Sequence, residues 1–257
     1  MRTPSGSLNT RRPRLSGPRK VAALLVLAAA ALLLLLTTSP IAQPLEYHNF
    51  ADQRSLAGLA NAANVLSNLV FVLVSLYGFS RLKRNRRQFA PLLMLYRIFF
   101  AGLLLIALGS GFYHLAPDNQ TLLWDRLPMT ISFTVLTALV VAERIDSRLG
   151  LALCPWLLGL GLASVLYWHW LDDLRPYLLV QFGPMLLLPV MIWRFEGPGT
   201  GWLWLALGFY VLAKVAELGD DLVYRFSQQL ISGHTLKHLL AAASAYMIAL
   251  KVRDTEG

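Results

Sequence analysis

Eight apolar stretches follow one another along the chain, separated by short polar segments. They lie near 20–38, 63–80, 92–114, 124–142, 149–168, 176–193, 201–219 and 235–251. A helix needs roughly 20 apolar residues to cross a bilayer, and backbone polar groups in lipid must be paired within their own segment. The pattern therefore predicts an all-α membrane protein, with no soluble domain of any size between the helices.

The composition agrees with this class. Hydrophobic residues make up 56% of the chain and charged residues 14%, and the mean hydropathy is +0.54, which excludes an ordinary soluble protein. The formal net charge is +9. Because the basic residues gather in short clusters between the apolar stretches, we expect the lipid bilayer, and no nucleic acid, as the partner. The single cysteine, Cys154, can form neither an internal disulfide nor a Cys-rich metal site.

The basic clusters recur after every second apolar stretch, so they fall on one side of the membrane. They lie at 11–20, 81–87, 144–148, 194 and 251–253. The alternate loops instead carry the acidic residues Glu46, Asp52, Asp118, Asp172, Asp173, Asp220 and Asp221. The positive-inside rule then predicts a multi-pass protein of the inner or plasma membrane with both termini in the cytoplasm.

The N-terminal part divides into three segments. We expect a disordered basic tail over 1–19, a signal anchor or transmembrane helix over 20–42, and an extracytoplasmic segment over 43–62. A cleaved signal peptide is the alternative for the second segment, although Pro40 spoils the small-residue pattern of a cleavage site. Residues 252–257 form a short C-terminal tail.

Three histidines fall at the ends of apolar stretches that share one side of the membrane. His114 closes the third stretch, and His234 and His238 open the eighth. Residues four apart on a helix lie on one face, which suits two imidazoles on one metal ion. A third histidine completes the three-ligand set typical of catalytic zinc, with one position left for water. Imidazole ligands suit Fe or Mn as well.

Two further polar residues lie at the same depth. Asp125, near the start of the fourth stretch, is a candidate general base, and Ser110, one turn before His114, is a candidate hydrogen-bonding partner in the same cavity. The alternative is that the histidines are interfacial side chains that reach toward the headgroups, which we favour for the isolated His48 and His169. For the group a metal site is favoured, because ionisable side chains cost about 2.5–3.5 kcal/mol at the centre of a span and are usually functional.

Charged residues in the last two stretches allow two simpler predictions. Lys214 and Glu217 are three residues apart on one predicted helix and are expected to pair inside the bundle. Lys237, between His234 and His238, is expected to point away from the metal and toward the headgroups.

At these residues the chain resembles the alkaline ceramidase family, within the CREST superfamily of seven-helix membrane hydrolases that also includes the adiponectin and progestin receptors. The resemblance rests on Ser110 and His114 in GSGFYHLAPD, Asp125 in LLWDRLPM, the HTLKH run from His234 to His238, and Ser67-Asn68 in NVLSNLVF. It covers about 50–251. It implies a seven-transmembrane helical bundle as catalytic core over 63–251, with the N-terminal hydrophobic helix as an addition.

The resemblance also implies an activity. The protein would be a zinc-dependent amide hydrolase that cleaves a membrane lipid, a ceramide or related N-acyl lipid, into a fatty acid and a long-chain amine. His114, His234 and His238 would bind zinc, and Asp125 and Ser110 would act in catalysis. A receptor or lipid-binding protein without hydrolytic turnover is the alternative, because the same helical framework serves receptors.

One departure from the family concerns calcium. Alkaline ceramidases carry an acidic calcium-binding cluster with a Glu shortly before the Ser-Asn pair, and here Asn61 takes that place. Glu46, Asp52 and Asn61 are a poor ligand set for a cation that takes 6–8 oxygens. Asp52 and Arg54 can as easily form an ion pair outside the site.

Overall fold

The computed structural model describes residues 17–254, and within this range helices form and no β-strand does. The helices are α1 (Gly17–Thr37), the 3-10 helix η1 (Leu45–His48), α2 (Ala62–Ser67), α3 (Leu69–Arg84), α4 (Leu93–Leu115), α5 (Asn119–Arg144), α6 (Ser147–Leu171), α7 (Arg175–Arg194), α8 (Thr200–Leu218), α9 (Asp220–Phe226) and α10 (Gly233–Asp254). The predicted all-α membrane class is confirmed. Residues 1–16 of the predicted basic tail and 255–257 of the C-terminal tail lie outside the described residues.

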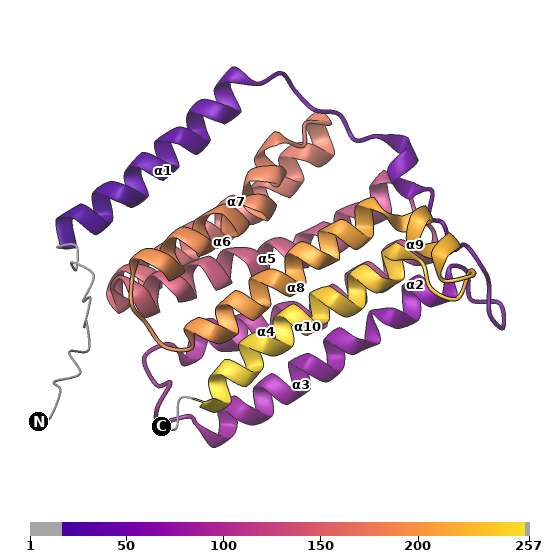
Figure 1. Cartoon of the computed structure of the whole chain (residues 1–257). Helices are drawn as coiled ribbons and strands as arrows, with labels where there is room; N and C mark the ends of the chain where they lie inside the picture. The colour runs from indigo at the N-terminus through magenta and orange to yellow at the C-terminus, as the bar shows by residue number, and fades with distance from the viewer. Residues whose placement is uncertain (1–16, 255–257) are drawn as a thin grey trace, which may run out of the picture.

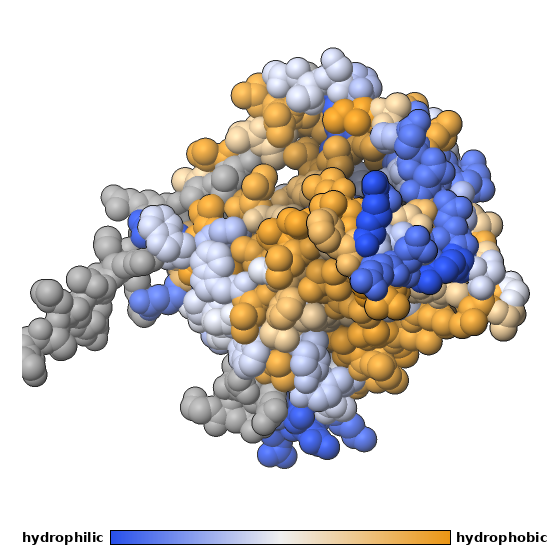
Figure 2. Space-filling view, turned by 45° about the vertical axis from the view of Figure 1, so that its right-hand side comes forward, coloured by the Kyte–Doolittle hydropathy of each residue, from blue (hydrophilic) through white to orange (hydrophobic). Residues whose placement is uncertain are grey.

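Six helical segments of the described chain are long and apolar enough to cross a membrane: Ala62–Arg84, Leu93–Leu115, Asn119–Arg144, Ser147–Leu171, Arg175–Arg194 and Thr200–Leu218. The seventh core helix, α10, has 22 residues and packs against α8 and α3, between which it lies in Figure 1. The additional helix α1 lies outside the bundle beside α7 (Figure 1). Figure 2 shows apolar residues over much of one face of the molecule and hydrophilic residues toward its edges.

The boundaries of α5 differ from those expected for the fourth stretch. The helix begins at Asn119 rather than near 124, because Asp118 and Thr121 form a capping box in which the Asp118 carboxylate accepts a hydrogen bond from the Thr121 amide at 2.6 Å. Asp125 therefore lies in the second turn of α5 and is buried. The longer helix carries this carboxylate inside the bundle instead of leaving it at the rim.

A glycine brings α4 and α5 together close to the site residues. A Cβ atom on Gly109 would lie 2.0 Å from the carbonyl oxygen of Trp124. Small residues of this kind let helix backbones approach closely in membranes. Because Gly109 precedes Ser110 and Trp124 precedes Asp125, this contact sets the distance between the serine hydroxyl and the carboxylate.

The opposite end of the bundle is joined by a buried ion pair. The Lys251 ammonium of α10 lies 2.6 Å from Glu143 Oε1 of α5 and 2.8 Å from the Tyr96 hydroxyl of α4. Lys251 lies 17 residues beyond His234, which is about 26 Å along an ideal helix. The two ends of α10 are thus anchored by separate polar clusters.

We predict that Gly109→Ala destabilises the protein while Gly111→Ala does not. The added methyl group at Gly109 meets the Trp124 backbone, which cannot move without shifting α5, and overpacking of this kind costs about 1–3 kcal/mol. Gly111 is the matched control, because a Cβ there meets nothing within 4 Å. Thermal unfolding of the purified proteins in detergent would measure the difference, and equal unfolding temperatures would contradict the close contact.

Candidate metal centre

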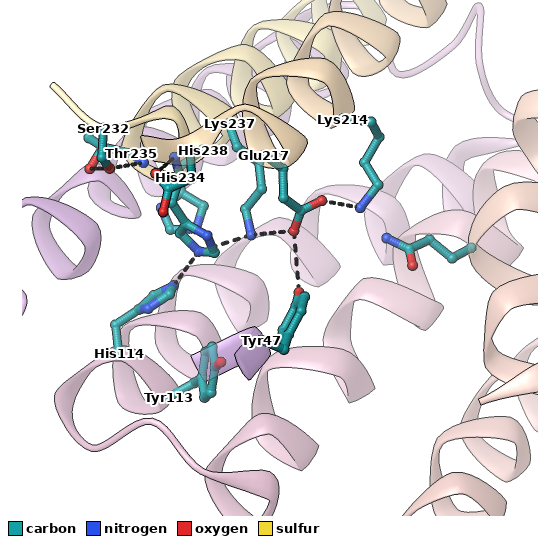
Figure 3. Close-up of polar contacts among 12 residues, drawn as sticks. Tyr47, Tyr113, His114, Lys214, Glu217, Ser232, His234, Thr235, Lys237 and His238 are labelled. Atoms are coloured by element: carbon teal, nitrogen blue, oxygen red, sulfur yellow. Dashed lines mark hydrogen bonds and ion pairs between the residues drawn. The ribbon is translucent and has the colours of Figure 1, made fainter. Parts of the chain in front are cut away.

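The three predicted histidines converge. His114 lies in the last turn of α4 and His234 and His238 in the first two turns of α10, all three are buried, and their ligand atoms lie within 4.8 Å of one another. Figure 3 shows His114 facing His234, and their Nε2 atoms are 3.3 Å apart. Imidazoles gathered in this way fit the donor set that zinc prefers. The site can hold a metal ion, and it is the only cluster of this kind among residues 17–254.

The sequence around the start of α10 explains how its histidines are placed. Ser232 caps the helix by accepting a hydrogen bond from the Thr235 amide at 3.0 Å. The Asp220 carboxylate accepts one from the His234 amide at 2.7 Å. A Cβ on Gly233 would lie 2.1 Å from the Ala216 carbonyl oxygen, so only glycine lets the helix begin this close to the end of α8.

Ser67 determines which nitrogen of His238 is available to a metal. The Ser67 hydroxyl donates its hydrogen to the Asn64 carbonyl oxygen at 2.9 Å. It therefore accepts from His238 Nδ1, 2.7 Å away, so Nδ1 carries the ring hydrogen and Nε2 keeps its lone pair. A partner of this kind fixes both the tautomer and the direction of a metal-binding imidazole.

Asp125 and Ser110 lie beside the histidines. Both are buried, and the Ser110 hydroxyl is within hydrogen-bonding reach of the Asp125 carboxylate. They line one cavity together with His238. Asp125 is not a member of the metal-ligand group, which leaves its carboxylate available for other chemistry.

The cavity extends from these residues into the apolar interior. It has a volume of about 130 Å³. Along α5 its wall runs from Asp125 past Met129 and Phe133 to Leu136, and along α10 from His238 to Ile248. Eleven residues of helix separate Asp125 from Leu136, about 16 Å at 1.5 Å per residue. His238 therefore lies at one end of a long, mostly apolar space, and His114 and His234 lie beside it.

A charged cluster lies next to the histidines, and it overturns one prediction. The predicted pair of Lys214 and Glu217 is confirmed. Lys237, however, does not point to the headgroups: its ammonium lies 3.0 Å from Glu217 Oε1 and 3.0 Å from His234 Nε2 (Figure 3). The physical reason is that Glu217 on α8 supplies a buried counter-charge on the side of α10 that faces the bundle.

Residues 47–52, which precede α2 and are called the covering segment, pack over one side of the site. The Phe50 ring packs against His114 and His234, with ring centroids 4.8 and 4.3 Å apart. His48, expected to be an isolated interfacial residue, instead lies 2.9 Å from both the Tyr113 hydroxyl and Asn119 Oδ1. These contacts tie the segment to α4 and α5, and they restrict access to the imidazoles from this side.

Tyr47 connects this segment to the charged cluster. Its hydroxyl donates to Glu217 Oε1 at 3.2 Å. Burial, and next the negative charge of Glu217, raise the pKa of Tyr47 well above its ordinary value, so the hydroxyl keeps its hydrogen.

The residues considered for calcium are engaged in different ways. The predicted ion pair of Asp52 and Arg54 is confirmed, with a closest distance of 2.7 Å, and hydrogen bonds from Arg54 lower the pKa of Asp52. Asn61 donates to the His114 carbonyl oxygen at 2.9 Å. Glu46 is exposed. Asn61 thus supports the metal centre instead of facing a shared cation with the other two.

Comparison with known protein families agrees with this geometry. The family model described as Ceramidase matches residues 53–194, more than half of the chain. The chain belongs to the ceramidase family. The resemblance inferred from the motifs is confirmed, and membership implies a hydrolase that acts on the amide bond of a ceramide-like lipid. No curated protein matches the chain.

The matched range of this ceramidase family member contains Ser67, Ser110, His114 and Asp125 but ends before His234 and His238. The meeting of the two α10 histidines with His114 is therefore a finding of the structure. Sequence reasoning did not find the roles of Ser67, Phe50 and Asp220 in positioning the rings. Only the family's Ser-Asn pair drew attention to Ser67. Nothing local to Phe50 indicates that it packs on His114 and His234, and nothing local to Asp220 indicates that it accepts a hydrogen bond from the His234 amide on the next helix.

We predict that Ser67→Ala weakens metal binding by about 10- to 100-fold, the usual effect of removing a residue that orients a ligand. Ser75→Ala is the matched control, because Ser75 is also buried, lies on the following helix α3, and donates to the Phe100 carbonyl oxygen. Competition with a chromophoric chelator would measure zinc affinity in both variants. Equal losses in the two variants would show that Ser67 acts only through stability.

The double variant His234→Ala/His238→Ala should lose the metal altogether, because one imidazole remains. Metal content of the purified protein, measured by mass spectrometry, tests this. Retention of the wild-type amount of metal by the variant would exclude this site.

Proposed function

We propose that the protein is an integral membrane, zinc-dependent amide hydrolase that cleaves a ceramide or related N-acyl lipid into a fatty acid and a long-chain amine. The observation that carries the proposal is the convergence of three buried imidazoles with Asp125 and Ser110 at one end of an apolar cavity. His114, His234 and His238 would hold the metal. Bound there, zinc would supply Lewis-acid chemistry and lower the pKa of water to about 7.

Asp125 is suited to general acid–base catalysis. Its buried carboxylate lies outside the ligand group, and it would accept the proton of the attacking water and return it to the nitrogen of the leaving amine. The new bond joins the water oxygen to the carbonyl carbon, and the carbon–nitrogen bond breaks. The products are then a fatty acid and a free amine.

Ser110 would orient the base and the substrate. Its hydroxyl reaches the Asp125 carboxylate and lines the same cavity. From that place it can also donate a hydrogen bond toward the carbonyl oxygen as negative charge develops there, which is a preorganised form of stabilisation. The close contact of Gly109 with α5 keeps the Ser110 hydroxyl near Asp125.

The cavity would hold the acyl chain. From Asp125 toward Leu136 the walls are mainly apolar. The acyl chain can therefore move from the lipid into the cavity at little cost in free energy, while the amide stays at the polar end. The basic clusters of the sequence support an orientation with the site near the extracytoplasmic face and both termini in the cytoplasm.

We expect Asp125→Asn to reduce hydrolysis by about 10²- to 10⁴-fold, the usual contribution of a general base, with little loss of metal. Fatty acid released from N-palmitoyl sphingosine by zinc-loaded protein gives the rate. Asp118→Asn is a suitable control, because Asp118 caps α5 at the surface and lies outside the cavity lining. Full activity of Asp125→Asn would exclude Asp125 as the general base. Metal binding by the wild type without cleavage of any N-acyl lipid would favour a lipid-binding protein instead.

A further inference from the structure

One wall of the cavity is charged rather than apolar. We call this wall the charged patch and define it as Lys214, Glu217 and Lys237, all of which line the cavity. Their side chains are 20%, 14% and 15% exposed, respectively. Glu217 binds both lysines, one through each carboxylate oxygen. Two ammonium groups therefore share a single carboxylate, and the patch carries one positive charge in excess.

Among the residues that the structure describes, Glu217 is the only carboxylate in contact with Lys214. Besides Glu217, its ammonium lies over the Phe182 ring, 5.4 Å from the centroid. The next carboxylate that acts on either lysine is Asp125, which is hydrogen-bonded to Ser110 and is the proposed base. One lysine would be enough to neutralise Glu217 and to join α8 to α10. Charged groups within spans are costly and usually functional, so the second lysine requires a reason.

The patch begins at the metal centre and extends along α8. Lys237 touches His234, and Lys214 lies one helical turn deeper than Glu217 (Figure 3). Beyond Lys214 the polar side continues with Gln181, whose amide donates to the Tyr210 hydroxyl at 3.4 Å. The charged and polar lining is thus concentrated near the metal centre, whereas most of the remaining lining, on α5, α7, α8 and α10, is apolar. An amide held at the histidines would place its acyl half in the apolar part of the cavity and its amine half against the charged patch.

The geometry points to a substrate whose amine half carries a carboxylate close to the amide nitrogen, that is, a single-chain N-acyl amino acid. The carboxylate would lie between Lys214 and Lys237, on the side of the two ammonium groups away from Glu217, and would neutralise the excess charge. Hydrolysis then consumes one water and releases a fatty acid and an amino acid. This inference rests on the proposed amide hydrolysis and narrows its substrate class.

Two substrates isolate the effect of a carboxylate on the amine half. N-palmitoylglycine and N-palmitoylethanolamine share the acyl chain and the amide and differ in a carboxylate against a hydroxymethyl group. We expect the zinc-loaded full-length protein to cleave N-palmitoylglycine with a kcat/KM about tenfold higher, the size of effect typical of a hydrogen bond between charged groups. Lys214→Gln should lower this ratio about tenfold, and Lys214→Arg, which keeps the charge, should preserve most of it.

Lys214→Gln leaves the pair of Glu217 and Lys237 intact, so we expect the variant to fold, and its metal content and unfolding temperature would verify this. Lys83→Gln, at the exposed end of α3, controls for the loss of one positive charge. Binding of both amides to the Asp125→Asn protein adds a measurement that does not depend on turnover. There too we expect N-palmitoylglycine to bind about tenfold more tightly.

The outcomes distinguish the two proposals. Cleavage of N-palmitoylethanolamine or N-palmitoyl sphingosine as fast as N-palmitoylglycine would overturn the inference and leave the hydrolase standing. No cleavage of any amide, together with Lys214-dependent tighter binding of N-palmitoylglycine, would overturn the hydrolase and support the recognition of the carboxylate. Equal binding of the two amides without cleavage would overturn both.

Discussion

Pairing of buried polar groups across helices is the constraint on which this structure depends. Hydrocarbon offers no hydrogen bonds, so a charged or polar side chain inside the bundle needs a partner from the protein. At one end Lys251, Glu143 and Tyr96 join α10 to α5 and α4. At the other end the histidines and the charged patch join α10 to α4 and α8. Between these two ends the helices pack against one another mainly through apolar side chains.

This arrangement allows the chemistry and the fold to use the same contacts. Ser67 and Asn61 hold His238 and His114 while also joining the start of the first core helix to α10 and α4. Asp220 connects the His234 amide to the Ala51 amide of the covering segment, with hydrogen bonds of 2.7 and 2.9 Å. Hydrogen bonds of this kind fix the position of the histidines, which is what a preorganised site requires.

The apolar cavity and the charged patch divide the site into two environments. Small side chains such as Ala206, Ala241 and Ala245 leave room along the helices, whereas the lysines and Glu217 confine charge to one wall. The covering segment packs the Phe50 ring against two of the imidazoles, at the end of the site where the histidines lie. A lipid held there would keep its amide at the boundary between the apolar and the charged walls.

The sequence alone determined the helical class, the approximate positions of the core helices and the helix ends at which His114, His234 and His238 lie. Hydropathy and helical spacing are local properties, and lipid allows few alternatives to a helix. Family motifs then indicated the hydrolase class. The direction of a side chain within the bundle was decided only by the tertiary structure, because it depends on partners far along the chain.

Lys237 shows this most clearly. Its neighbours in sequence predict a lysine that reaches for headgroups, yet Glu217 on another helix turns it inward. His48 is similar, since Tyr113 and Asn119 take it into the covering segment. The hydrogen on His238 depends on Ser67, 171 residues away. Local patterns indicate which residues lie at the same end of the helices. Packing decides which of them touch, because each contact requires two helices to be rotated about their axes so that the two side chains face each other.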